Sequence, residues 1–340
     1  MERPIDPVSR ETGDGGRRRP LILVGGNMGR GDGVDYAARF RTDFPEADFL
    51  SFEGRPEMLE RRIADVDAVI GPVPDQLLVR APRLRWVSST GAGAGGMTSA
   101  AYRARPEVVA TTVSGVHTAS VPEHTLAMLL AFARCLPEQI LNQHGAHRFY
   151  WPTAMFEVEG QTMGILGLGQ IGRSLAVKAR GLGMRVVGWR RRDEPVDPGL
   201  LDHQYRPGEL LDLLPAADHV VITLPLTPAT HHLIGARELA AMKRSAYLFN
   251  VGRGAVVDQL ALLAALRDGV IAGAGLDVTD PEPLPPEDPL WDLPNCLILT
   301  HYAGLTPAYG PRAYRILAAN LRRFLDGEPL DNVVDKEAGY

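Results

Sequence analysis

The sequence predicts an α/β protein with two Rossmann-like domains, each built on a parallel sheet. From Pro20 onward, short apolar runs alternate with amphipathic stretches, the pattern of strands alternating with helices. A chain of 340 residues is long enough to bury two separate cores. A third observation is a G-x-G-x-x-G run between a strand-like and a helix-like segment, typical of dinucleotide-binding domains.

The first α/β unit contains four apolar runs and two amphipathic stretches. We expect strands at Leu21–Val24, Asp67–Ile70, Arg85–Ser88 and Val108–Thr112, and helices at Asp35–Phe44 and Pro56–Ile63. A single long helix is then expected from Val121 to about Gln143, followed by a loop that ends near Pro152.

The second α/β unit has six strand-like runs. They are Thr162–Leu166, Arg185–Trp189, His219–Leu224, Ala246–Asn250, Ile271–Ala274 and Cys296–Leu299. A last helix, at about 311–325, is expected to pack back on the first unit. The predicted division is therefore a flexible leader (1–19), a discontinuous substrate domain (20–120 and 306–331), a dinucleotide-binding domain (121–305) and a tail (332–340).

Charge and cysteine content exclude several classes of partner. With 36 Lys and Arg against 41 Asp and Glu, the chain has no general attraction for nucleic acid or an anionic membrane. Cys135 and Cys296 lack the spacing of metal or redox sites, so we expect no metal site and a reducing, cytoplasmic location. No apolar run has the length of a membrane span, and 1–19 has no signal-peptide core.

The glycine run is the strongest functional signal. Gly167 permits a tight turn, Gly169 lets backbone N–H groups approach a pyrophosphate, and Gly172 allows the helix to pack closely on the strand. The helix N-terminus then faces the phosphates with its positive end. We predict that Gly167, Gly169, Gln170, Ile171 and Gly172 bind a dinucleotide.

The end of the second strand indicates which dinucleotide. NAD sites carry an acidic residue there, which accepts hydrogen bonds from the ribose hydroxyls. This chain has Arg190, Arg191 and Arg192, and a guanidinium pairs instead with a 2′-phosphate. NADP(H) is therefore preferred. NAD(H) stays possible if Asp193 reaches back through a bulge.

Three further segments follow predicted strands, where open parallel sheets place their ligands. They carry Arg253 between two glycines, the carboxylates of a proline-rich loop from Asp277 to Pro283, and His301. Reduction of a 2-keto acid needs such a set. The arginine binds the substrate carboxylate and polarises the carbonyl, the histidine protonates the oxygen, and a carboxylate orients the imidazole.

From about Pro20 to Asp331 the chain resembles the D-isomer-specific 2-hydroxyacid dehydrogenase family. The segments that carry the resemblance are Gly167–Gly172, Leu224–Pro228, Asn250–Asp258, Asp277–Pro283 and His301. The resemblance implies a flavodoxin-like substrate domain, a cleft between the two domains, and a homodimer built largely from the dinucleotide-binding domains.

The resemblance also implies roles for single residues. Arg253 would bind substrate, Glu282 would pair with the histidine, and His301 would be the general acid/base. Asp277 would bind the nicotinamide carboxamide, with Leu224 and Pro225 also in the cofactor site. The loop Gly91-Ala92-Gly93 would hold the substrate carboxylate through backbone N–H groups, as an anion-binding nest does.

Some positions depart from the family pattern. Arg190 stands where most members carry Asp, which makes the chain similar to the NADP-using glyoxylate/hydroxypyruvate reductase branch. Thr300 replaces a common Pro, Tyr302-Ala303 replaces Ile-Gly or Ile-Ala, and His117 stands where many members have Asn. These changes surround the pocket and bear on substrate identity more than on catalysis.

The predicted function is NADPH-dependent reduction of a small 2-keto acid, such as glyoxylate or hydroxypyruvate, to the D-2-hydroxy acid. One alternative is a dinucleotide-sensing binding protein, because the same fold includes transcriptional corepressors. Another is oxidation of a small anion such as phosphite or formate. Arg190 disfavours the second alternative, because such enzymes usually regenerate NADH.

Overall fold

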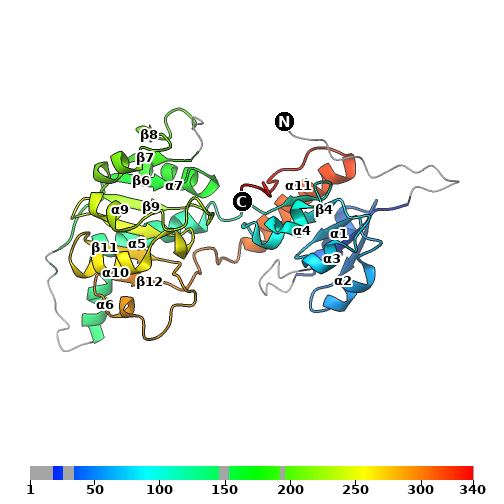
Figure 1. Cartoon of the computed structure of the whole chain (residues 1–340), viewed down its shortest axis with the longest axis horizontal. Helices are drawn as coiled ribbons and strands as arrows, with labels where there is room; N and C mark the ends of the chain where they lie inside the picture. The colour runs from blue at the N-terminus through cyan, green and yellow to red at the C-terminus, as the bar shows by residue number, and fades with distance from the viewer. Residues whose placement is uncertain (1–17, 26–33, 145–151, 153, 192–195, 340) are drawn as a thin grey trace. The chain divides into compact units, whose positions relative to one another are not determined.

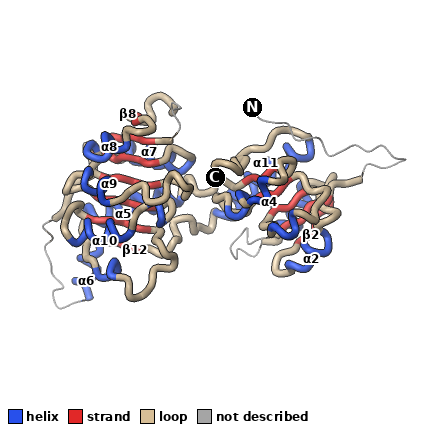
Figure 2. Tube along the Cα trace, viewed as in Figure 1, coloured by secondary structure: helices blue, strands red, loops and turns tan. Residues whose placement is uncertain are grey.

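The computed structural model describes residues 18–25, 34–144, 152, 154–191 and 196–339. The chain divides into two compact units, 1–116 with 306–340 and 117–305. Each unit carries one parallel sheet with helices around it (Figures 1 and 2), as the sequence predicts. The first boundary lies four residues before the predicted one, and the second coincides with it. Residues 1–17 of the expected leader lie outside the described residues.

The first unit has five parallel strands in the order β2-β1-β3-β4-β5, which is the flavodoxin-like order. The strands are β1 Leu21–Val24, β2 Asp48–Ser51, β3 Ala68–Ile70, β4 Trp86–Ser88 and β5 Val109–Thr111. The helices are α1 Tyr36–Asp43, α2 Pro56–Arg62, the 3₁₀ turn η1 Gly95–Thr98, and the one-turn helices α3 Asp75–Leu78 and α4 Ala100–Arg103. The sequence prediction missed β2, α3 and α4, because four residues are too few to show a periodicity.

The described chain beyond residue 305 belongs to the first unit. The helix α11, Tyr309–Asp326, buries Tyr314 and Leu317 against the sheet. Residues 332–339, which lie in the predicted tail, are tied to the sheet of this unit. Val334 is buried, and its N–H donates to the carbonyl of Ala110 at 2.8 Å. Two adjacent valines are too short a signal to predict such a pairing from sequence.

The second unit has seven parallel strands in the order β12-β11-β10-β9-β6-β7-β8, the Rossmann order with one added strand. They are β6 Thr162–Leu166, β7 Arg185–Trp189, β8 His203–Tyr205, β9 His219–Ile222, β10 Tyr247–Asn250, β11 Gly273–Leu276 and β12 Cys296–Ile298. The direction of winding reverses between β6 and β9, the point at which doubly wound sheets bind dinucleotides.

The helices of this unit are α5 Ser120–Ala133, α6 Leu136–His144, α7 Gln170–Gly181, α8 Leu210–Leu213, α9 Ala236–Ala241 and α10 Gln259–Arg267, with 3₁₀ turns η2 Leu214–Ala216, η3 Gly254–Val256 and η4 Pro289–Asp292. The single helix expected over 121–143 is wrong. Cys135 adopts a left-handed backbone with φ 53° and separates α5 from α6. Pro137 explains the break, since proline removes an N–H and fits only the first turn of a helix.

Two strand predictions in this unit also need correction. The strand β8 was missed, and β11 lies two residues later than the predicted Ile271–Ala274. The shift includes Gly275, at which a Cβ atom would lie 2.8 Å from the Phe249 ring. Close packing of the neighbouring strand, which sequence periodicity does not register, therefore selects glycine inside β11.

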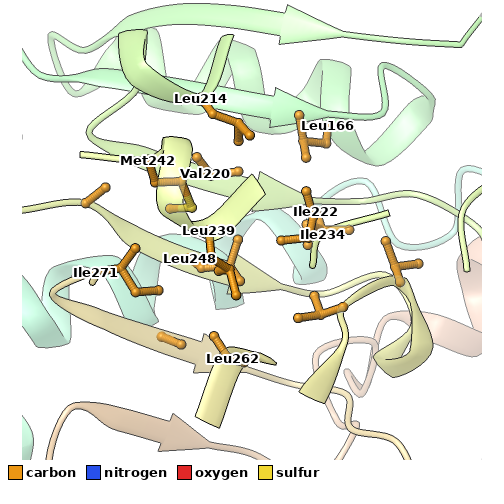
Figure 3. Close-up of a cluster of buried hydrophobic side chains, with 14 of the residues drawn as sticks. Leu166, Leu214, Val220, Ile222, Ile234, Leu239, Met242, Leu248, Leu262 and Ile271 are labelled. Carbon is orange, nitrogen blue, oxygen red and sulfur yellow. The ribbon is translucent and has the colours of Figure 1, made fainter. Parts of the chain in front are cut away.

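Apolar side chains fix the sheet of the second unit against its helices. Figure 3 shows Leu239 of α9 and Leu262 of α10 over side chains of the sheet, among them Val220 and Leu248, and all four are essentially buried. Burial of each such side chain contributes roughly 1.5–3 kcal/mol. The strands thus form a rigid platform that holds the loops at their carboxyl ends.

Candidate active site

The glycine loop between β6 and α7 has the geometry of a dinucleotide site. Gly167 has φ 106°, a conformation that L side chains rarely adopt. A Cβ at Gly172 would lie 2.0 Å from the Gly167 carbonyl oxygen, so glycine is required where helix and strand meet. At Gly169, the N-cap of α7, an added Cβ would meet nothing within 4 Å. The loop therefore presents its backbone to open space at the helix N-terminus.

Arg190 and Arg191 lie beside this loop. They directly follow β7, and the N–H of Gly167 donates to the carbonyl of Trp189 at 2.9 Å. Arg190 is half-buried and Arg191 is exposed. The alternative in which Asp193 serves NAD concerns a residue outside the described part of the chain.

The loops after β9 and β10 pack against each other. A Cβ at Gly252 would lie 2.6 Å from the Leu224 carbonyl oxygen. The next carbonyl, of Pro225, accepts a hydrogen bond from Thr230 Oγ1 at 2.7 Å, which holds the first loop in place. Leu224 and Pro225 thus occupy the same sheet edge as the glycine loop. Their place in the cofactor site stays a prediction.

Arg253 projects from the loop after β10 and is exposed. Asn250 fixes its backbone: the Asn250 amide donates to the Arg253 carbonyl at 2.9 Å and accepts from the Gly252 N–H at 3.1 Å. The glycines on either side of Arg253 have a packing role, because a Cβ at Gly254 would lie 1.9 Å from the Thr279 carbonyl oxygen. They allow neighbouring backbones to meet.

His301 and Glu282 form a pair. Nδ1 of His301 lies 2.5 Å from Oε1 of Glu282, and the two side chains are 45% and 41% exposed. A pocket of about 250 Å³ borders both groups and is also lined by Asp277 and Trp291. An imidazole held through Nδ1 keeps Nε2 for proton transfer at an accessible surface, the arrangement that a general acid requires.

Asp277 is 2% exposed and takes several donors. Its Oδ1 accepts from the N–H groups of Tyr302 and Ala303 at 3.0 and 3.2 Å. Burial raises the pKa of this carboxyl, but His124 and these two N–H groups outweigh burial and hold the pKa below its usual value. The carboxylate therefore organises the loop that carries His301. Its expected contact with a nicotinamide carboxamide stays a prediction.

His124 is the residue of this region that sequence reasoning missed. It lies on α5, with Nε2 3.3 Å from Oδ1 of Asp277, an ion-pair distance without hydrogen-bond alignment. The sequence did offer one signal. A histidine that shares a helix with the buried residues Leu126 and Leu129 needs a polar partner if it is buried too.

The loop Gly91-Ala92-Gly93 follows β4 in the first unit. The Gly91 N–H donates to Ser89 Oγ at 2.9 Å, so this donor of the expected nest is engaged within the turn. The carbonyl of the preceding residue, Thr90, accepts from the Tyr309 hydroxyl at 2.5 Å. A pocket of about 420 Å³ borders Ser89 and Thr90. Binding of a substrate carboxylate here stays a prediction.

Comparison with known proteins identifies the family. Residues 126–303 match the profile described as D-isomer specific 2-hydroxyacid dehydrogenase, NAD binding domain. A glyoxylate reductase from Korarchaeum cryptofilum is 36% identical over 305 residues, covering 86% of this chain and 90% of that protein. The chain belongs to the D-isomer specific 2-hydroxyacid dehydrogenase family. It is therefore an oxidoreductase with a domain for a nicotinamide dinucleotide.

Other members of the family agree over most of their length. A glyoxylate/hydroxypyruvate reductase B from Pectobacterium carotovorum is 36% identical, covering 89% of this chain and 95% of that protein. A Sinorhizobium meliloti NADPH-dependent glyoxylate/hydroxypyruvate reductase, solved with NADP and sulfate, has TM-score 0.77 and 27% identity over 95% of this chain and 100% of that one. A Xanthobacter autotrophicus dehydrogenase solved with NADPH has TM-score 0.79 and 29% identity, covering 95% and 100%.

In the described part of the chain, no group of three or more His, Cys, Asp or Glu side chains is arranged to hold a metal ion. Among the same residues, no helix combines the length and apolar character that crossing a membrane requires.

Proposed function

We propose that this dehydrogenase uses NADPH to reduce a small 2-keto acid, of the glyoxylate or hydroxypyruvate type, to the D-2-hydroxy acid. The observation that carries the proposal is the His301–Glu282 pair at 2.5 Å on the sheet edge that also bears Arg253 and the glycine loop. The names of the relatives support the substrate class.

The residues present fit a bound nicotinamide dinucleotide, which would supply the hydride. The open backbone at Gly169 and the close approach of Gly172 to Gly167 match the needs of a pyrophosphate at a helix N-terminus. Arg253 holds the substrate carboxylate through a planar fork and polarises the carbonyl. As hydride reaches the carbonyl carbon, His301 gives its proton to the oxygen, and Glu282 keeps the ring oriented.

The preference for NADP(H) rests on Arg190 and Arg191. Two guanidinium groups beside the glycine loop favour a 2′-phosphate, and structures of related proteins contain NADP or NADPH. A ribose hydroxyl gains no acceptor from either side chain.

Four further assignments complete the proposal. Asp277 binds the nicotinamide carboxamide, the loop Gly91-Ala92-Gly93 binds the substrate carboxylate, the enzyme works in the cytoplasm, and it forms a homodimer. The homodimer is supported by α6, on which Leu136, Ile140 and Leu141 are 47%, 57% and 76% exposed. An apolar helix face of this kind is typical of a surface that another chain covers.

The corepressor-like and phosphite- or formate-oxidising alternatives are less favoured. A sensor needs no paired imidazole and carboxylate, and both reductase relatives act on keto acids by name. The decisive experiment measures NADPH and NADH oxidation with a panel that includes glyoxylate, hydroxypyruvate and pyruvate. Parallel assays follow NAD(P)⁺ reduction with phosphite and formate. Turnover of phosphite or formate alone, or binding of cofactor without turnover, would reject the proposal.

A further inference from the structure

His301 has a backbone conformation that its own side chain disfavours. Its φ is 54°, in the left-handed region, which a residue with a Cβ atom disfavours. Such a conformation persists only where the surroundings impose it. The orientation of the imidazole toward Glu282 therefore depends on whatever holds this turn of the chain.

Asp277 holds this turn in place. Its backbone carbonyl accepts from the His301 N–H at 2.8 Å, and its carboxylate accepts from the next two N–H groups, of Tyr302 and Ala303. Three successive backbone N–H groups of the turn thus donate hydrogen bonds to Asp277. Because a carboxylate accepts from N–H groups in strong, charge-assisted bonds, a shift of Asp277 would release the whole turn.

His124 in turn holds Asp277 and the turn. Its Nε2 lies 3.3 Å from Asp277 Oδ1, and its ring meets the Tyr302 ring edge-on with centroids 4.9 Å apart at 88°. The His124 side chain is only 11% exposed. It comes from α5, whose apolar residues Leu126 and Leu129 are buried in the core of the second unit, so the imidazole has a rigid support.

We propose that His124 is a positioning residue for proton transfer: through Asp277 and Tyr302 it fixes the backbone of His301 and thereby the His301–Glu282 pair. The proposal rests on the role of His301 in the proposed function. His124 acts on the orientation of the pair, through its contacts with Asp277 and Tyr302.

The kinetic test replaces His124 by Leu and by Gln. His124→Leu removes the polar contact, and kcat should fall about 10- to 100-fold, because misplacing a catalytic group by about 1 Å costs that much. His124→Gln should recover most of kcat, since its amide nitrogen reaches the place of Nε2. The control is Glu123→Gln, which changes the neighbouring residue and its exposed pair with Lys178.

A second measurement needs neither substrate nor cofactor. The ring signals of His301 in an NMR spectrum, identified by their loss in His301→Gln, should move in His124→Leu and stay in place in Glu123→Gln. Unmoved signals together with wild-type kcat and a lower melting temperature would show a merely structural role and overturn the proposal. If the wild type reduces no keto acid, the proposed function fails, while the NMR result still decides whether His124 positions His301.

His124→Asn repeats the test with a polar side chain, in case His124→Leu does not fold. Its amide is too short to reach Asp277, so it should reproduce the effects of His124→Leu on kcat and on the His301 signals. Wild-type behaviour of a folded His124→Asn protein would equally overturn the proposal.

Discussion

At the scale of single residues, Arg253 offers a test of how the substrate is held. A guanidinium can grip a carboxylate through two parallel N–H···O bonds, which the ammonium of lysine cannot reproduce. Arg253→Lys should therefore raise KM and lower kcat together for keto acids, while the NADPH dissociation constant changes by no more than a few-fold. Arg267→Lys, at the exposed end of α10, is the matched control. Unchanged kinetics with a reduced melting temperature would assign Arg253 a structural role instead.

Arg190 and Arg191 offer a second test, of cofactor preference. Charge-assisted hydrogen bonds contribute about 1.5–3 kcal/mol each, so losing one should weaken NADPH binding roughly tenfold or more. Arg190→Asp combined with Arg191→Gln should raise KM for NADPH by at least that factor and change KM for NADH little. Arg185→Gln, at the exposed other end of β7, should change neither. A wild-type enzyme that prefers NADH tenfold in kcat/KM would contradict this assignment.

At the scale of elements, β9 carries a buried histidine with a consequence for acid stability. His219 is 1% exposed, with Nε2 2.5 Å from Gln161 Oε1, and burial lowers its pKa from 6.5 to about 4. Below pH 6.5 the unfolded chain binds a proton here that the folded chain does not accept until about pH 4. The contribution of the neutral, buried His219 to the free energy of unfolding is therefore fully present above pH 6.5 and is lost as pH falls toward 4.

The expected loss of stability on acidification can be measured with one variant. Between pH 7.5 and 5 the free energy of unfolding should fall by about 2 kcal/mol through His219 alone. His219→Gln should be less stable than the wild type at pH 7.5, because it loses ring packing on Phe156, yet it should lose about 2 kcal/mol less on acidification. Urea denaturation at both pH values measures this, with exposed His203→Gln as the control. Equal losses in wild type and His219→Gln would disprove the assignment.

The elements also show what sequence reasoning could reach. Runs such as Thr162–Leu166 are buried on both faces and read clearly as strands, and the glycine loop follows from backbone requirements that only glycine meets. The break between α5 and α6 was missed although Pro137 signals it. The pairing of β8 depends on neighbours distant in sequence, so no local pattern of three residues indicates it.

Part of the candidate site could be predicted from the sequence, and part could not. His301 and Glu282 stand in segments that carry the family resemblance, and the resemblance implied their pairing. The anchoring role of Asp277 could not be foreseen, because it depends on how the turn at 301–303 folds onto β11. His124 lies more than 150 positions before that turn in the chain, and only the packing of α5 on the sheet brings it near Asp277.

At the scale of the whole molecule, the proposed assembly rests on one exposed apolar helix face. Leu136, Ile140 and Leu141 leave an apolar face on α6 exposed, and covering one such side chain contributes roughly 1.5–3 kcal/mol. Introducing charge there should then oppose association strongly, since an unpaired charge in an apolar interface is costly.

The proposed homodimer is tested by Ile140→Glu combined with Leu141→Glu. Light scattering after size-exclusion chromatography should give twice the chain mass of 36.9 kDa for the wild type and a mass near the single chain for the variant. Leu260→Glu, which changes a leucine on α10 that is 78% exposed, should leave the mass unchanged. A wild type of single-chain mass would reject the homodimer, and a variant that stays dimeric would place the interface away from α6. Because the mass of the assembly is read without substrate, the result stands whatever keto acid the enzyme reduces.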